Sequence, residues 1–290
     1  MKFVTIIILL NLCFNQTTFN FLNLPYNSRS IGLNNVGVAC SSEYLSINPA
    51  SIQINKNQYS FNHSLLPANI KMSGISFVKP FLTNVIFIQI RNINYGDLKD
   101  DSNNLKFSAN DLSFELGHKF ELKKAVSIGY SLGYISSRIL NYSATGLYAN
   151  IGFKFHFINN RLGFGSMINN FGFQINSYAG KNELLPTSIR NGLYYKPLYL
   201  PVNLYLDYVS LKNDAKNKIC FGVELFLDNK SNIYFSFTSD KNDLDIGQYY
   251  KDLFNKVGFG FNVKVKQINY NLSVQNLGPL GIVYGFSIIM

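Results

Sequence analysis

Apolar residues alternate with polar or very small ones over residues 257–277, which read VGFGFNVKVKQINYNLSVQNL. A period of two places every apolar side chain on one face of a β-strand and the other set on the opposite face. The parity of the apolar positions shifts by one between Val265 and Ile268. A two-residue turn at Lys266 and Gln267 would place Val265 opposite Ile268, so both strands would keep a common apolar face. The segment therefore predicts a two-faced β-hairpin.

The composition limits what the apolar face can contact. Of the 290 residues, 47% are hydrophobic and 15% aromatic, whereas only 14% are charged. That charged fraction is well below the roughly 25% of an average soluble domain. Yet no internal run approaches the roughly 18 apolar residues that a membrane-spanning helix needs. A chain that is apolar overall but has no long apolar run has dispersed its hydrophobicity, as the strands of a membrane β-barrel do.

Similar two-faced segments recur after residue 56, and many are long enough, at roughly nine to eleven residues, to cross a bilayer as tilted strands. Long polar connections at 95–104, 176–185 and 239–252 all fall on the same side of an up-and-down meander, and short turns join the strands on the other side. This asymmetry is typical of outer-membrane barrels. We expect about fourteen strands, at 57–65, 70–79, 82–91, 107–120, 124–137, 140–157, 161–175, 186–196, 199–210, 217–227, 231–240, 256–265, 268–276 and 281–290.

The predicted fold class is all-β, a transmembrane antiparallel up-and-down β-barrel that covers residues 57–290 of a bacterial outer-membrane protein. Its Val, Phe and Ile face would contact outer-membrane lipid, and its Gly, Asn, Lys and Gln face would line the interior. The sheet must close, because an open edge in hydrocarbon would leave backbone groups unpaired. A soluble, secreted β-sandwich or β-helix is the alternative, but it predicts neither an even strand number nor long loops on one side only.

The first residues have the pattern of a secretory signal peptide. A single Lys2 precedes an apolar run over residues 3–14, which is too short to span a bilayer. We therefore predict a signal peptide at residues 1–18, with a buried first strand as the alternative. Cys13 raises the possibility of a lipoprotein, but residues 10–12 are not the small residues that a lipidation site requires. Lipidation is therefore the weaker reading.

Residues 19–56 do not alternate and form a separate predicted unit, an N-terminal periplasmic or plug segment. A disordered periplasmic leader and a plug folded into the barrel both fit its Asn and Ser content. Its apolar residues favour the packed plug; they are Phe19, Phe21, Leu22, Leu24, Ile31, Leu33, Val36 and Val38. After removal of the leader the chain keeps Cys40 and Cys220, and their spacing indicates neither a disulfide scaffold nor a metal site. Whether these two cysteines pair stays open.

Several short stretches, in order along the chain, resemble the PorV/PorQ outer-membrane family. The segment LPTSIRNGLYYKPLYLPVNLYLDY at 185–208 is similar to the mid-chain segment of that family, and VQNLGPLGIVYGFSI at 274–288 is similar to its closing hairpin. The other matches lie in the predicted plug and are candidate motif residues: Phe21, Leu22, Asn23, Leu24, Pro25, Ser28, Arg29, Gly32, Asn48, Pro49 and Ala50.

The resemblance implies a fourteen-stranded barrel related to the FadL fatty-acid transporters and a role in type IX secretion. Members of the family hold a cargo or surface protein at the outer membrane, and the opening and closing motifs favour the PorQ-like branch. The sequence departs from the family at Asn27, where a small residue is usual, and at Asn34 and Asn35, where two glycines are usual. Asn tolerates a positive φ better than most residues, so the backbone turn can survive this change.

The residues that carry chemistry are sparse. His63, His118 and His156 are isolated, and none has a Cys, Asp or Glu at metal-ligand spacing. The G-x-S-x-G, H-E-x-x-H and P-loop motifs are missing, and the acidic stretch 240–247 does not fit the register of a calcium loop. We therefore predict no enzyme activity, no cofactor and no metal. The net charge of +10 is scattered along the chain rather than clustered, so nucleic acid is not an expected partner.

Three functions remain open at this point. The principal prediction is a non-enzymatic component of type IX secretion that holds a surface or cargo protein as its partner. The alternative is a FadL-like transporter of hydrophobic small molecules across the outer membrane, and the third is a purely structural or adhesive barrel. A lumen lined by Asn, Gln, Ser and Lys disfavours a ligand channel that is apolar throughout.

Overall fold

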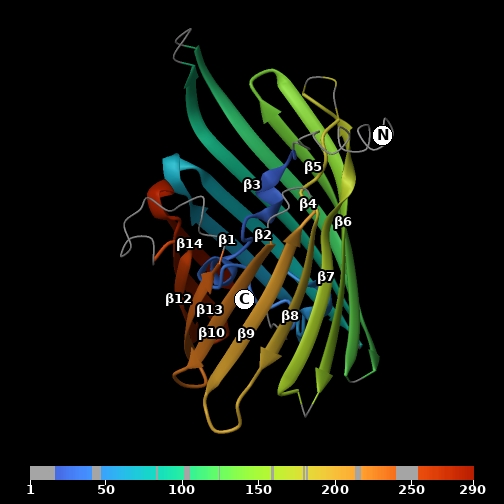
Figure 1. Cartoon of the computed structure of the whole chain (residues 1–290), viewed down its shortest axis with the longest axis vertical. Helices are drawn as coiled ribbons and strands as arrows, with labels where there is room; N and C mark the ends of the chain where they lie inside the picture. Colours follow the sequence, from blue (N-terminus) through green and yellow to red (C-terminus); the bar gives the residue numbers. More distant parts are fainter. Residues whose placement is uncertain are drawn as a thin grey trace, which may run out of the picture.

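The computed structural model describes residues 17–40, 47–82, 84–100, 105–123, 125–157, 160–178, 180, 182–212, 217–239 and 254–290. Within these ranges, fourteen antiparallel strands form one closed barrel in which each strand pairs with its sequence neighbours (Figure 1). The strands are β1 (Gln58–Leu65), β2 (Lys71–Phe81), β3 (Asn84–Asp100), β4 (Leu105–Lys123), β5 (Val126–Ile139), β6 (Tyr142–Phe157), β7 (Leu162–Asn176), β8 (Ser188–Tyr195), β9 (Val202–Leu211), β10 (Asn217–Phe226), β11 (Ser231–Thr238), β12 (Val257–Val265), β13 (Ile268–Asn276) and β14 (Ile282–Ile289).

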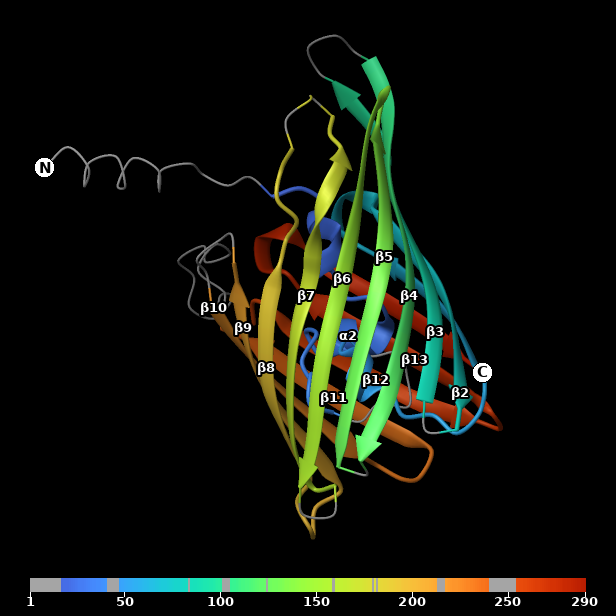
Figure 2. The same ribbon diagram turned by 90° about the vertical axis from the view of Figure 1, so that its right-hand side faces the viewer.

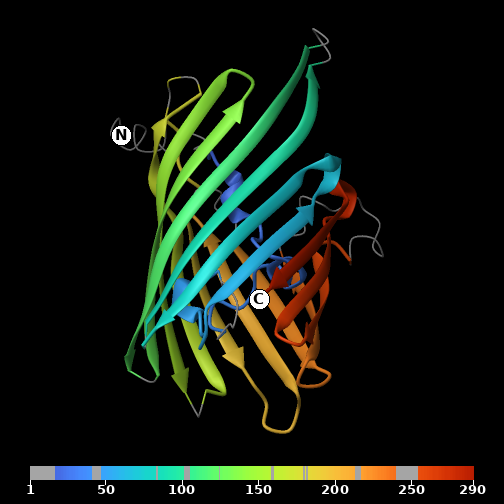
Figure 3. The same cartoon turned by 180° about the vertical axis from the view of Figure 1, so that it is seen from behind.

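The first and last strands close the barrel. β1 pairs with β14 in an antiparallel register that places His63 opposite Phe286, and Figure 3 shows the first strands beside the last ones. Every backbone edge inside the membrane is thereby paired, as hydrocarbon requires. The predicted fold class is confirmed, and each predicted strand overlaps one of the observed strands. In the described part of the chain no helix combines the length and the apolar character needed to cross a membrane.

The hairpin at 257–277 forms as its alternation predicts. Val265 pairs with Ile268 across the turn, and Lys266 adopts a left-handed φ of 57° there. Phe259 points outward with 47% of its surface exposed, whereas Asn262 faces the interior at 6%. The polar face therefore lines the lumen, and the apolar face covers the outside of the barrel.

The outside of the barrel carries a belt of exposed large apolar side chains. Such a continuous apolar exterior is stable in lipid but not in water, because soluble proteins rarely expose apolar patches of this extent. On three adjacent strands the belt comprises Leu112, Phe114 and Leu116 of β4, Tyr130, Leu132 and Tyr134 of β5, and Leu147, Ile151 and Phe153 of β6.

The wall of the barrel is much taller on one side. Strands β3 to β7 have between 14 and 19 residues, whereas β1 and β8 to β14 have between 8 and 10. Figure 2 shows β4 to β7 rising beyond the shorter strands at the end opposite the short turns. We call β3 to β7 the tall wall.

The predicted loop at 95–104 was wrong in its first half. β3 continues to Asp100, because beyond an irregularity between Asn94 and Asp97 it pairs again with β4, for example Leu98 with Phe107. Cross-strand hydrogen bonds satisfy this backbone although its side chains show no alternation. The predicted acidic loop at 240–247 and residues 1–16 of the predicted signal peptide lie outside the described residues.

Residues 17–54 that the structure describes lie inside the ring of strands, where Figure 1 shows them surrounded by the wall. We call this segment the plug. It contains the short helices η1 (Asn20–Asn23), α2 (Ser28–Gly32) and η2 (Pro49–Ser51). Helix α2 packs on β12, β13 and β14, and η2 packs on β4, β5 and β6, so the plug contacts opposite sides of the lumen. Two further short helices, η3 (Pro67–Asn69) and η5 (Gly278–Leu280), lie in loops between strands.

Candidate functional site

On three strands of the tall wall, β3, β5 and β6, the outward side chains become polar near the upper end. On β5 the outward side chains are apolar up to Tyr134, but the next two in the same row are Ser136 and the exposed Arg138. The inward side of the same strand changes in the opposite sense, from the buried Ser131 to Ile135, which is fully buried. The strand is therefore apolar outside and polar inside within the belt. Just above the belt its outside is polar, and its inside carries Ile135 and then the buried Ser137.

A similar change occurs on β3 and β6. On β3 the outward row passes from Ile90 to Asn92, and the inward row passes from Arg91 to Ile93, which is 0% exposed. On β6 the outward row ends in polar residues, while Ala144 faces inward at 0% exposure. An outer surface that becomes polar marks where the wall leaves the lipid, and the apolar side chains on the inner surface there are buried in the lumen.

The inward apolar side chains at this level form one cluster, which we call the mouth cluster. The plug supplies part of it, so its own apolar side chains fill the space that the wall encloses. Burial of each such side chain stabilises the packed state by about 1.5–3 kcal/mol. The buried members are Phe19, Phe21, Met72, Ile93, Ile135, Ala144, Tyr148 and Leu185, and Leu22, Leu24, Leu66, Ile70, Tyr95 and Tyr178 pack around them.

The predicted motif from Phe21 to Pro25 lies between the mouth cluster and the lumen. Phe21 is buried beneath the guanidinium of Arg91, which lies 5.2 Å from the ring centroid. The Arg91 Nη1 donates to the backbone oxygen of Leu24 at 3.1 Å. Leu22 and Leu24 pack against the mouth cluster, and Pro25 follows as a partly buried residue. The motif therefore fixes the upper part of the plug to β3.

Asn23 of the same motif binds a bulge in the wall. Its Oδ1 accepts a hydrogen bond at 3.1 Å from Nδ2 of Asn170, which has a left-handed φ of 55° at an irregularity of the β6–β7 ladder. The backbone N–H of Asn170 donates to Oδ1 of Asn150 at 2.8 Å. Sequence reasoning missed this contact. The Asn169–Asn170 pair inside a strand was the available signal, because Asn adopts left-handed conformations readily and bulges need them.

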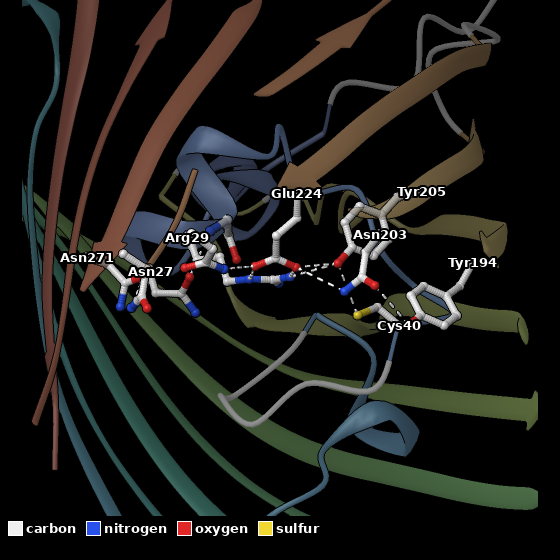
Figure 4. A network of polar contacts seen from close by, with 11 residues as sticks. Asn27, Arg29, Cys40, Tyr194, Asn203, Tyr205, Glu224 and Asn271 are labelled. Atoms are coloured by element: carbon white, nitrogen blue, oxygen red, sulfur yellow. Dashed lines mark hydrogen bonds and ion pairs between the residues drawn. The ribbon is translucent and has the colours of Figure 1, made fainter. Parts of the chain in front are cut away.

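Arg29 forms an ion pair in the lumen with Glu224 of β10. Its Nη2 lies 2.9 Å from Oε2 of Glu224, and both side chains are largely buried. Glu224 also accepts hydrogen bonds from Tyr205, Asn203 and Asn232, so donors surround its charge (Figure 4). Sequence reasoning identified Arg29 but not its partner. The only signal for Glu224 was an acidic residue on the polar face of an otherwise apolar strand.

Ser28 and the Asn48–Ala50 motif bind the wall on opposite sides. Ser28 donates through its backbone N–H to Ser287 and through Oγ to Ser273, each at 2.9 Å. Asn48 Nδ2 donates to the backbone oxygens of Val38 at 2.7 Å and of Phe153 at 3.2 Å.

Glycine on the wall allows the third motif to approach closely. Ala50, which follows Pro49 in η2, accepts a hydrogen bond through its backbone oxygen from Ser127 Oγ at 2.8 Å. At Gly129 of β5, an added Cβ would lie 2.4 Å from the backbone nitrogen of Ala50. Only a glycine fits beneath η2 at this position.

The backbone turn is kept at the two asparagines that stand where the PorV/PorQ family usually has glycines. Asn34 and Asn35 both adopt left-handed conformations, with φ of 51° and 57°. Asn34 Nδ2 also donates to Ser236 Oγ at 2.9 Å and to the backbone oxygen of Lys256 at 2.8 Å. The side chain thus adds contacts to the wall that a glycine cannot make.

The cysteines and histidines give no sign of chemistry. Cys40 and Cys220 are both buried and are not joined by a disulfide; Cys40 Sγ lies 3.7 Å from Tyr205 Oη. Burial raises the pKa of the Cys40 thiol. His63 shares a hydrogen bond with Ser73, and in the part of the chain that is described no three metal-ligating side chains gather.

In the short turn between β10 and β11, the carboxylate of Asp228 accepts several hydrogen bonds. The backbone N–H of Lys230 donates to the Asp228 carboxylate, and Ser231 donates to it through its hydroxyl and its N–H. These bonds lower the pKa of Asp228. These hydrogen bonds stabilise the β10–β11 turn and do not contribute to the lining of the lumen.

A cavity of about 80 Å³ lies below the mouth cluster, between the plug and the tall wall. Polar side chains line much of it, including Arg91, Glu115, Asn150 and Arg190. A cavity that binds benzene needs about 150 Å³ and an apolar lining. With the plug in this position, the lumen therefore has no continuous path for a hydrocarbon through this cavity.

Comparisons with known proteins identify the fold. No family model and no curated protein sequence matches the chain. The toluene transporter TodX of Pseudomonas putida matches with a TM-score of 0.62 at 12% identity, over 92% of this chain and 96% of that chain. The Ralstonia pickettii toluene transporter TbuX matches with a TM-score of 0.59 at 12% identity, over 94% and 98%. A Pseudomonas aeruginosa FadL homologue matches with a TM-score of 0.57 at 10% identity, over 91% and 98%.

None of these matches supports the PorV/PorQ resemblance itself. They support only the FadL-like barrel that this resemblance implies. At 10–12% identity the likeness extends to the fold and no further. The chain has the closed fourteen-stranded fold of FadL-like outer-membrane channels.

Proposed function

We propose that this protein is a non-enzymatic outer-membrane channel for hydrophobic small molecules and that the plug gates it. The inward apolar side chains above the lipid belt, Ile93, Ile135 and Ala144, are the observation that carries this proposal. A barrel that serves only as an anchor needs an apolar exterior, but it does not need an apolar inner surface above the lipid. The solved structures of this fold are described as toluene transporters, monoaromatic hydrocarbon channels and a FadL homologue, which agrees with this assignment.

The plug and the ligand compete for the same surface. Phe19, Phe21, Leu22 and Leu24 of the plug fill the mouth cluster. A hydrophobic molecule that enters from outside can replace their contacts, and the polar cavity beneath stops it until the plug moves. Passage therefore couples ligand entry to release of the plug from the wall.

Uptake by proteoliposomes tests the proposal. Vesicles that contain the full chain should take up radiolabelled toluene faster than empty vesicles of the same lipid. Ile135→Asn places an amide in the mouth cluster at a fully buried position and should lower the initial rate about tenfold, since an unpaired buried polar group costs about 1–3 kcal/mol.

Ser136→Asn is the matched control, because Ser136 is the next residue of β5 and faces outward. Labelling of the buried Cys40 in both variants shows whether the plug stays docked. Equal toluene uptake by protein-containing and empty vesicles would contradict the proposal.

The type IX secretion role rests on the sequence resemblance alone. The motif residues from Phe21 to Pro25 and from Asn48 to Ala50 contact the barrel wall, and this packing accounts for their identity without a protein partner. Co-purification of a surface protein with the detergent-solubilised barrel would restore that role as a second function.

A further inference from the structure

Two buried arginines line the cavity between the plug and the wall. Arg91 of β3 is 4% exposed and Arg190 of β8 is 3% exposed. Each donates one hydrogen bond to the plug, Arg91 to the oxygen of Leu24 at 3.1 Å and Arg190 to the oxygen of Asn35 at 3.2 Å. The Nε of both is buried without a hydrogen-bond partner among the described residues.

Neither arginine forms a hydrogen-bonded ion pair in the described part of the chain. The ion pair found in the described part of the chain joins Arg29 and Glu224, so neither Arg91 nor Arg190 takes part in one there. The carboxylate that lines the cavity is Glu115. The buried carboxylate of Asp207 also attracts Arg190, but no hydrogen bond joins these two side chains in the described part of the chain.

Hydrogen bonds from neutral groups already satisfy the Glu115 carboxylate. Glu115 accepts hydrogen bonds from Tyr148 at 3.0 Å and Asn150 at 3.1 Å. Asp207, on β9 beside β8, accepts through Oδ2 from the backbone N–H groups of Gly37 and Val38. Burying an unpaired ion costs several kcal/mol, so proteins pair buried charges. A small oxyanion in the cavity would give the Nε–H groups of both arginines the hydrogen-bond acceptor that they lack.

The size and the lining of the cavity select the class of anion. A volume of about 80 Å³ holds a group of a few heavy atoms and excludes a long hydrocarbon. Arginine presents planar N–H donors that match the oxygens of phosphate and carboxylate. Tyr26 of the plug also lines the cavity.

We propose that this cavity is a binding site for a small oxyanion, a phosphate or a carboxylate, that Arg91 and Arg190 hold between the plug and the wall. Because both arginines also bind plug carbonyl oxygens, the bound anion links β3 and β8 through the plug and favours its docked position. The site does not depend on which molecule the channel transports, so it can stand if the transport proposal fails.

Equilibrium dialysis of the detergent-solubilised full chain tests the site. Radiolabelled inorganic phosphate and radiolabelled acetate are the probes, each at constant ionic strength in sodium chloride. We expect saturable binding of at least one of them to a single site, and the two arms distinguish phosphate from carboxylate. Arg91→Gln and Arg190→Gln should each weaken binding about tenfold or more, since a hydrogen bond to a charged group contributes about 1.5–3 kcal/mol.

Two further variants separate a specific site from a loss of folding or of net charge. Arg190→Lys keeps the charge and should retain part of the affinity. Arg138→Gln removes a charge from the exposed outer end of β5 and should bind like the unmodified protein. Absence of saturable binding of both anions to the unmodified chain would overturn the proposal, as would an equal loss of binding in Arg138→Gln.

Discussion

At the scale of single residues, the Arg29–Glu224 pair is an ion pair that joins the plug to the barrel. Breaking such a pair from one side leaves a buried charge without its counter-ion, which costs about 3 kcal/mol. Arg29→Gln should therefore raise the rate at which Cys40 is labelled by a thiol reagent about hundredfold, because that thiol is exposed only when the plug undocks. A Cys13→Ser, Cys220→Ala background makes Cys40 the reporting thiol.

Two controls show whether the effect belongs to the pair. Arg138→Gln removes the same charge from the outer face of β5 and should leave the labelling rate unchanged. The double variant Arg29→Gln with Glu224→Gln should recover part of the loss, because it removes the uncompensated carboxylate. An unchanged rate in Arg29→Gln would show that the pair does not hold the plug.

Single residues also show where sequence reasoning stopped. Arg29 could be singled out from a motif, but Glu224 lies 195 residues away and only the closed barrel brings the two together. The left-handed conformations of Asn34 and Asn35 could be anticipated, because asparagine adopts a positive φ more readily than most residues. Contacts between the plug and the wall depend on the strand register of the closed barrel. No local sequence pattern in the plug predicts that register.

At the scale of elements, alternation predicted the strands well because each strand separates lipid from a polar lumen. The alternation disappears where a strand no longer separates lipid from a polar lumen. β3 continues beyond Asn94 with polar residues on both faces, so residues 95–100 were predicted as loop although residues 97–100 pair with β4. The change from apolar to polar outward residues was visible in the sequence of β5, but it could be interpreted only once the height of the lipid belt was known.

The boundary on β5 makes a quantitative prediction for the membrane. Leu132 is 64% exposed within the apolar belt, and Ser136 lies four residues further along the outward row. Leu132→Arg should lower the free energy of unfolding by about 2–4 kcal/mol, whereas Ser136→Arg should lower it by at most about 1 kcal/mol. Guanidinium unfolding of the barrel in lipid vesicles measures both. Equal losses in the two variants would show that the lipid does not end between these positions.

At the scale of the whole molecule, the plug and the barrel form one packed unit. Helix α2 is joined to β13 and β14 by hydrogen bonds of Ser28, and η2 is joined to β5 by a bond from Ser127 to Ala50. These contacts lie on opposite sides of the lumen, and the mouth cluster adds apolar contacts above them. If a hydrophobic molecule crosses this barrel, at least one of these contact regions must open.

A reversible cross-link decides whether the α2 contact is the one that opens. Ser28 Oγ and Ser273 Oγ are 2.9 Å apart, close to the separation of two bonded sulfurs at about 2.05 Å. The double variant Ser28→Cys, Ser273→Cys should therefore form a disulfide that fixes α2 to β13. In a background with Cys40→Ala and Cys220→Ala, oxidation should abolish toluene uptake by proteoliposomes, and reduction should restore it.

A second cross-link separates motion of the plug from general rigidity of the barrel. His63 and Ser73 lie opposite each other on the outward faces of β1 and β2 and share a hydrogen bond, so His63→Cys with Ser73→Cys joins two strands of the wall without touching the plug. Its oxidised form should transport at the same rate as its reduced form. If the oxidised Ser28–Ser273 variant also keeps its full rate, passage does not require α2 to leave β13, and the opening must instead lie at the mouth cluster or at the contact of η2 with β5.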